Sequence, residues 1–263
     1  MTAEIPPVSL WLQNGFHRFL RSFLKRHFHA IGLDRNSSCA DSIDSDKPLI
    51  VYGNHPSWWD PLLAHFLNRT LFPKRQFYAP IDADALEQYP VFAKLGFYGV
   101  RMHRASGAGA FLKQSLAILA AGNTAIWMTP EGRFADARDR TATLMPGLAH
   151  LCSRLTEGCV LPIALEYVFW EERLPVCLIT LGKPLLIEHR QALSKKQWSE
   201  LLEAELRAAQ DRLCGLAIAR RSEPFDNLLH GKAGAGWFYD GMRRVRRWRH
   251  GGKARVQHGK EFE

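Results

Sequence analysis

The chain has 263 residues and a formal net charge of +9, because 35 Lys and Arg residues outnumber 26 Asp and Glu residues. The surplus is confined to the ends: residues 1–33 carry +3 and residues 241–263 carry +6, whereas residues 34–240 are neutral. This distribution excludes a uniformly basic, histone-like protein, and 46% hydrophobic residues exclude a disordered chain. It is typical of a globular domain whose cationic ends meet an anionic partner.

The cysteines and the apolar runs narrow the class further. The chain has five cysteines, an odd number, and none of them are in CxxC spacing. This pattern predicts neither a disulfide framework nor a zinc site, and it favours a protein of the reducing cytosol. No apolar run reaches the roughly 18 residues that span a bilayer, and the N-terminus lacks the pattern of a secretory signal. We therefore expect a protein that works in the cytoplasm without crossing a membrane.

Residues 10–31 form the first informative segment. Apolar residues recur at spacings of three and four, which predicts an amphipathic helix. The apolar positions are Leu12, Phe16, Phe19, Leu20, Phe23, Leu24, Phe28 and Ile31. Basic residues such as Arg18 and Lys25 lie between them, as in helices at a membrane interface. The pattern also fits a helix packed on the domain with a solvated basic face, and the two interpretations are compatible.

Strands and helices alternate through the middle of the chain, after a polar linker at 34–47. Apolar runs predict strands at 48–53, 76–79, 97–100, 124–128, 160–165 and 174–181, and helical patterns lie at 58–67, 83–95, 108–121 and 147–156. Ser194 is positioned to cap a long helix that ends near residue 216. The alternation predicts an α/β fold, a mixed and largely parallel sheet flanked by helices.

Three units follow from this pattern. We expect an amphipathic, membrane-associated helix at residues 1–33, an α/β domain at 34–217 and a basic, aromatic C-terminal extension at 218–263.

The segment NHPSWWD, residues 54–60, directly follows the strand at 48–53. Strand carboxyl ends are where α/β proteins place ligand sites. Asp60 is close enough in sequence for its carboxylate to reach the imidazole of His55, fix its tautomer and stabilise the imidazolium of a general base. A structural loop histidine beside a helix-start aspartate also fits this short pattern. Ser57 lacks the glycine-flanked elbow of a serine nucleophile and is interpreted as a helix cap.

Two further segments offer groups for an anionic ligand. TPEGRF, residues 129–134, follows the strand at 124–128. There Gly132 lets the backbone approach a ligand, Arg133 offers a planar donor fork for phosphate, and Glu131 is placed to orient that arginine or accept from a substrate hydroxyl. GFYGVRMHR, residues 96–104, adds Arg101 and Arg104. Either segment can also be a solvated surface turn, for 129–134 one with an ion pair, that has no role in function.

Together with the apolar strand VLPIA at 160–164, these segments resemble in order those of the glycerolipid acyltransferases, whose best-known members acylate lysophosphatidic acid. The resemblance covers about residues 48–185. It implies that His55 and Asp60 are the catalytic pair and that Glu131 and Gly132 belong to the glycerol-phosphate segment. It also implies acyl transfer from acyl-CoA or acyl-carrier protein to a lipid hydroxyl, without a metal or a further cofactor.

The sequence departs from the family pattern at two places. Arg133 follows Gly132 directly, where the family has one residue between Gly and Arg. The second segment lacks the usual Asp-Arg ending, so either Arg101 or Arg104 matches the substrate arginine. Both departures concern the acceptor. A lyso-ornithine lipid, a glycolipid or a carotenoid glycoside therefore stays open as acceptor beside a lysophospholipid. The alternatives from other classes are a membrane-binding or nucleic-acid adaptor without activity and a hydrolase.

The cationic ends fit a lipid-modifying enzyme. The segment WFYDGMRRVRRWR, residues 237–249, mixes aromatic residues with arginines, which suits an anionic membrane surface or an acidic acyl-carrier protein. We expect a peripheral enzyme on the cytoplasmic face of the membrane, with the lipid surface, a lysophospholipid and the acyl donor as partners. The aromatic residues favour a membrane over nucleic acid, although the arginines alone fit both.

Overall fold

The computed structural model describes residues 5–37, 43–44, 46–101, 105–231 and 262. Its strands are β1 (Ala30–Asp34), β2 (Leu49–Gly53), β3 (Gln76–Asp82), β4 (Phe97–Val100), β5 (Thr124–Met128), β6 (Cys159–Val168), β7 (Val176–Leu181), β8 (Leu185–Leu186) and β9 (Phe225–His230). Its α-helices are α1 (Leu10–His27), α2 (Asp60–Leu71), α3 (Ala83–Gln88), α4 (Val91–Leu95), α5 (Ala105–Ala120), α6 (Gly147–Cys152) and α7 (Lys195–Ala219). Short 3-10 turns lie at Arg35–Ser37 and Ile187–His189.

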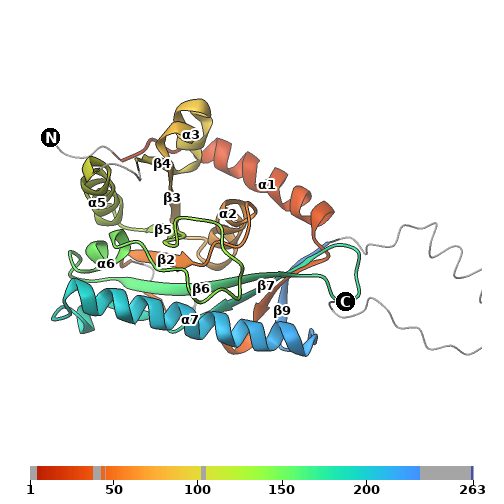
Figure 1. Cartoon of the computed structure of the whole chain (residues 1–263). Coiled ribbons are helices and arrows are strands. Elements are labelled where there is room, and N and C mark those ends of the chain that lie inside the picture. Colours follow the sequence, from red (N-terminus) through yellow and green to blue (C-terminus); the bar gives the residue numbers. More distant parts are fainter. Residues whose placement is uncertain (1–4, 38–42, 45, 102–104, 232–261, 263) are drawn as a thin grey trace, which may run out of the picture.

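The strands form one sheet in the order β4-β3-β5-β2-β6-β7-β1-β9, with β8 paired to β6 (Figure 1). The run from β4 to β6 is parallel throughout, and β1 is parallel to β7. Antiparallel pairs join β6 to β7, β6 to β8 and β1 to β9. The mixed, largely parallel sheet flanked by helices is thereby confirmed. Because parallel strands share a direction, the loops after β2, β3, β4 and β5 meet at one edge.

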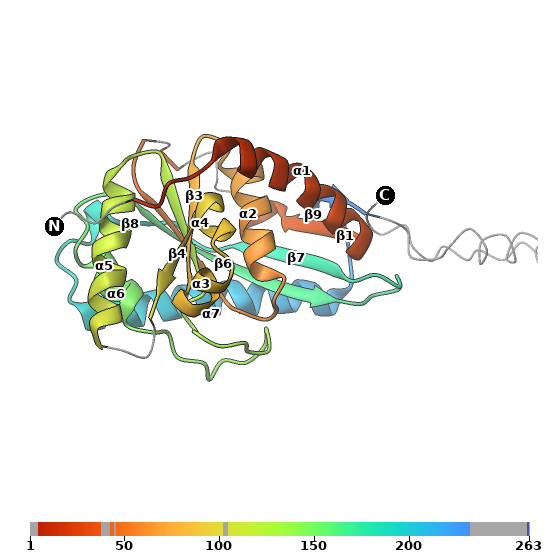
Figure 2. The same cartoon turned by 90° about the horizontal axis from the view of Figure 1, so that it is seen from above.

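Helices cover both faces of the sheet. One core cluster joins α1 and α2 to one face, and a second joins α5, α6 and α7 to the other. Figure 2 shows α1 and α2 in front of the sheet and α7 behind it. All five residues of β2 are buried, which explains why LIVYG is continuously apolar rather than alternating.

The helix predicted at residues 10–31 ends earlier, at His27. Phe28 is already extended, and the His29 N–H donates to the carbonyl of Pro175 at 2.9 Å, which draws the following residues into β1. Leu20 and Leu24 are fully buried, so the interpretation of this helix as packed on the domain is confirmed. Its role at a membrane interface stays a prediction.

The sheet also extends beyond the predicted middle unit. β1 crosses the boundary predicted between residues 33 and 34, and β9 lies within the predicted extension 218–263. The helix predicted at 83–95 is two helices, because Pro90 has no N–H to continue α3. The Ser194 cap is confirmed, since its hydroxyl accepts from the N–H of Gln197 in a capping box at the start of α7.

The whole basic segment 237–249 lies outside the described residues, as does Arg104. Among the helices that the structure describes, none is both long and apolar enough to cross a bilayer.

Candidate active site

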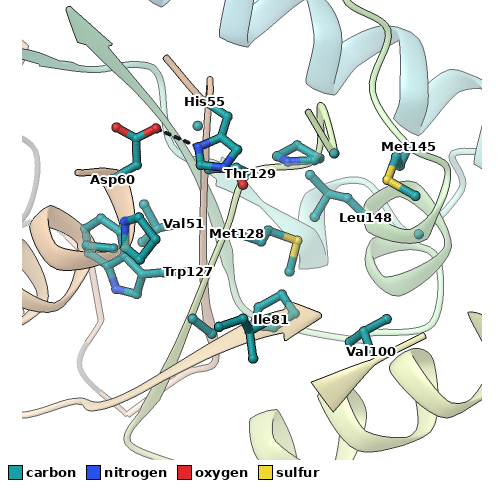
Figure 3. Close-up of a pocket in the computed structure, with 18 of the residues that line it drawn as sticks. Val51, His55, Asp60, Ile81, Val100, Trp127, Met128, Thr129, Met145 and Leu148 are labelled. Atoms are coloured by element: carbon teal, nitrogen blue, oxygen red, sulfur yellow. Dashed lines mark hydrogen bonds and ion pairs between the residues drawn. The ribbon is translucent and has the colours of Figure 1, made fainter. Parts of the chain in front are cut away.

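His55 and Asp60 meet at the carboxyl end of β2. His55 lies in the loop after that strand, and Asp60 begins α2, so the five-residue spacing brings the imidazole Nδ1 to 2.6 Å from the carboxylate Oδ2 (Figure 3). Two more donors reach the buried carboxylate: the Ser57 N–H at 3.0 Å and the Tyr167 hydroxyl at 2.5 Å. Hydrogen bonds to a carboxylate favour its charged form. The pair can therefore stabilise an imidazolium on His55.

Ser57 does not cap α2 with its side chain. Trp59 is the N-cap residue and carries no side-chain cap. The Ser57 hydroxyl instead accepts from the Trp59 N–H at 3.3 Å, while its backbone N–H binds Asp60. This residue orders the loop between the two site residues, and the prediction of a capping serine was wrong.

The sequence did not reveal two residues that hold the pair. Burial raises the pKa of Tyr167, so its phenol keeps its proton and donates to Asp60. The buried Asn54 side chain binds both the N–H and the carbonyl of Leu165 at 2.9 Å, which fixes the end of β2 to β6. The predicted strand ended at Leu165, and this end point left Tyr167 unnoticed. Asn54 belongs to the segment 54–60, but the sequence analysis assigned it no role.

A cavity of about 650 Å³ opens beside this pair, at the shared edge of the parallel strands. Its lining is largely apolar and includes Val51, Ala64, Leu67, Ala79, Ile81, Phe97, Val100, Phe111, Trp127, Met128, Leu148, Ile163 and Leu165. Figure 3 shows His55 and Asp60 at one side of this apolar lining, with Ile81 and Val100 away from them. In the described structure His55 lines the cavity and Asp60 holds its Nδ1, which leaves Nε2 as the other ring nitrogen. That nitrogen is available to a substrate.

The residues of the segment 129–134 differ in whether they line the cavity. Gly132 lines the cavity with φ +65°, a conformation that glycine adopts without strain. Glu131 is only 6% exposed; its Oε2 accepts the His55 N–H at 3.0 Å and its Oε1 pairs with Arg207 Nη1 at 3.1 Å. Arg133 is 57% exposed by its side chain and pairs with Asp139 at 3.4 Å. Neither charged side chain lines the cavity of the described structure.

Arg101 lies at the far end of the same cavity. It follows β4, its side chain is 57% exposed, and it pairs with Glu87 at 3.3 Å. Three strand spacings separate β4 from β2, or about 14 Å at roughly 4.8 Å each. The structure thus brings together His55, Asp60 and Gly132, and it places Arg101 across the sheet from them. Arg104 lies outside the described residues.

The loop after β5 holds His55 by its backbone and its ring. The Ala135 N–H donates to the His55 carbonyl at 3.1 Å, while Glu131 accepts the His55 N–H. The Phe134 ring lies against the imidazole, with centroids 4.4 Å apart. His55 is therefore fixed from both sides by residues that follow the neighbouring strand.

Among the described residues, no cluster of three or more His, Cys, Asp or Glu side chains is arranged to hold a metal ion. The family model described as Acyltransferase matches residues 34–166, about half of the chain, from the end of β1 into β6. None of the curated proteins compared with the chain matches it. The matched span contains His55, Asp60, Glu131 and Gly132 in the geometry just described. The chain belongs to the acyltransferase family, the glycerolipid acyltransferases that include the lysophospholipid acyltransferases.

Proposed function

We propose that this acyltransferase moves a fatty acyl group from acyl-CoA or an acyl-carrier protein to the hydroxyl of a lysophospholipid such as lysophosphatidic acid. The observation that carries the proposal is the His55–Asp60 pair beside an apolar cavity of about 650 Å³. An apolar cavity of this size suits a fatty chain. A base at its edge suits the thioester at the end of that chain.

The geometry supports a direct transfer. With Nδ1 held by Asp60, Nε2 of His55 takes the proton of the acceptor hydroxyl as its oxygen attacks the thioester carbonyl. The carbon–sulfur bond then breaks, and the imidazolium returns the proton to the departing thiolate. General-base assistance contributes about 10²–10⁴ in rate, and alignment of the two substrates contributes further.

The acceptor headgroup is proposed to lie near Arg101, Arg133 and Arg104. Arg101 lines the cavity, which supports a contact with an anionic headgroup. A second candidate is an acceptor without a phosphate, such as a lyso-ornithine lipid or a glycolipid. The observation in its favour is that Arg133 pairs with Asp139 away from the cavity.

The substrate assay separates these candidates. The purified chain is incubated with acyl-CoA or acyl-carrier protein and a panel of lyso-lipids, and the products are identified by mass spectrometry. An acylated lysophospholipid supports the leading proposal, and acylation of phosphate-free lipids alone supports the second. Free fatty acid without acylated lipid indicates a hydrolase, and no reaction indicates an adaptor without activity.

We also propose that α1 binds the membrane surface that supplies the acceptor. Trp11 and Phe19 are 83% and 59% exposed, although α1 packs on the domain, and Arg18, Lys25 and Arg26 are exposed beside them. Aromatic and basic side chains on one helix face suit an anionic bilayer interface. Flotation with anionic vesicles tests this: Trp11→Ser with Phe19→Ser weakens binding, whereas Ile218→Ser, an exposed apolar residue on α7, leaves it unchanged.

The basic C-terminal segment is proposed to add to this attraction, at about 1 kcal/mol for each basic residue before screening. Replacing the five arginines between 243 and 249 by glutamine tests its share. This is a cleaner change than deletion of 241–263. Deletion also removes Phe262, whose ring lies 5.8 Å from that of Trp170 and 6.2 Å from that of Phe225. Flotation that is unchanged in the glutamine variant contradicts a role for this segment.

A further inference from the structure

The carboxylate of Glu131 is occupied by the protein rather than directed into the cavity. Its two neighbours, Pro130 and Gly132, line the cavity, but the Glu131 side chain is almost wholly buried. One oxygen accepts the His55 N–H and the other meets Arg207. Glu131 thus connects the backbone of the proposed base to a positive charge on α7.

Arg207 is tied to the same loop at several points. Its guanidinium donates to Glu131, to the carbonyl of Ala142 and to the side chain of Gln210. Gln210 in turn donates to the carbonyl of Ala137 at 3.1 Å. Since α7 begins at Lys195, this anchor lies outside the matched span 34–166. A helix beyond the matched region therefore holds the loop that holds His55.

A buried carboxylate needs a partner. Removing one member of a buried ion pair leaves the other uncompensated, and the remaining group then takes up a proton or moves toward water. Either change weakens the acceptor that Glu131 offers to the His55 N–H. A displacement of about 1 Å at a reacting group can lower a rate by about 10²-fold.

We propose that Arg207 is a positioning residue of the acyl-transfer site, which sets the place of the His55 imidazole through the charge of Glu131. This inference rests on the proposed role of His55 as general base. It assigns Glu131 to support of the base rather than to contact with the acceptor.

A double-mutant cycle tests the coupling. Arg207→Met is expected to lower kcat by about 10²-fold with less than a threefold change in KM, whereas Glu131→Gln keeps a neutral acceptor and lowers kcat by less than about tenfold. In the Glu131→Gln background, Arg207→Met then lowers kcat by less than threefold. Equal losses in both backgrounds, or a kcat for Arg207→Met within twofold of the wild type, overturn the proposal.

A matched control exists in the same interface. Arg140 of the loop and Asp211 of α7 form an ion pair at 2.7 Å, but neither touches His55. Asp211→Asn removes a loop–helix ion pair and is expected to leave kcat unchanged. Arg207→Lys keeps the charge without the planar fork and restores part of the kcat lost in Arg207→Met. If Arg207→Met does not fold, Arg207→Lys takes its place as the test variant. If Arg207→Met folds, a kcat of Arg207→Lys below that of Arg207→Met contradicts the proposal.

Hydrogen exchange of the His55 amide gives a readout that needs no substrate. Arg207→Met is expected to speed this exchange by at least tenfold, while Asp211→Asn leaves it unchanged. An unaltered His55 exchange rate in folded Arg207→Met overturns the positioning role. Absence of acyl transfer by the wild-type chain, with exchange responding as expected, contradicts the proposed function and leaves the Arg207–Glu131–His55 connection supported.

Discussion

Two segments of this protein follow buried parallel strands and reach the same edge of the sheet, yet they use their charged side chains differently. In residues 54–60, His55 and Asp60 bind each other beside the cavity. In residues 131–133, Glu131 turns into the protein and Arg133 turns toward solvent. The first segment carries the reacting group that we propose, and the second supports it through the His55 backbone.

This difference shows that strand position predicts where a segment lies but not where its side chains point. The two segments are also anchored on opposite faces of the sheet. Residues 54–60 lead into α2, which packs against α1, whereas Glu131 is held by α7.

The largest effect is expected at the proposed base. His55→Ala removes the proton acceptor and is expected to lower kcat by about 10²–10⁴ without a change in thermal unfolding. His189→Ala, at an exposed position of a 3-10 turn, serves as the control. Acyl transfer at the wild-type rate by the His55 variant contradicts the mechanism.

Acid is expected to destabilise the α1–α2 side. Burial, followed by His17 and Arg69, lowers the pKa of His65 on α2 to about 3. In the unfolded chain His65 binds a proton near pH 6.5, whereas in the folded protein it does so only near pH 3. The free energy of unfolding therefore falls as the pH drops from about 6.5 toward 3, by roughly 2 kcal/mol at pH 5. The free energy of unfolding is measured in urea at pH 7 and at pH 5. Between these two pH values, His65→Leu is expected to lose about 2 kcal/mol less of this free energy than the wild type. An equal loss in both proteins rules out this source of acid sensitivity, and His189→Gln is the control.

Loss of the Tyr167 hydroxyl is expected to have a smaller effect on rate. Tyr167→Phe removes one hydrogen bond to Asp60, worth about 1 kcal/mol, so kcat falls by roughly tenfold or less. Tyr52→Phe is the matched control, since that buried hydroxyl donates to Leu202 instead. Equal kcat values in Tyr167→Phe and Tyr52→Phe contradict the role of Tyr167.

The smallest effect is expected at the exposed arginines. Arg101→Gln and Arg133→Gln are each expected to raise KM for a phosphate-bearing acceptor by up to about tenfold, because solvent weakens contacts of exposed charges. Arg35, in the 3-10 turn after β1, has the same 57% side-chain exposure and pairs with Asp226 of β9, so Arg35→Gln is the control. Unchanged KM in both test variants favours the phosphate-free acceptor.

Several local features were predictable because they depend on neighbouring residues. The strands at 97–100 and 124–128 appear with the predicted bounds, since short apolar runs between turns leave few alternatives. The approach of Asp60 to His55 also follows from a short loop that leads directly into a helix. By contrast, α1 ends at His27 because the following residues form β1, which pairs with β7. The helical pattern of residues 10–31 gives no sign of this pairing.

The sequence by itself determined the class of fold, the sheet edge that carries the candidate site and the pairing of His55 with Asp60, because these depend on the alternation of strands and helices and on short spacings. Tertiary structure alone decided which distant groups complete the site. Tyr167 reaches Asp60 across 107 positions, and Arg207 reaches Glu131 across 76. Such contacts depend on how β6 and α7 pack against the β2 and β5 loops, and no local spacing in the chain encodes that packing.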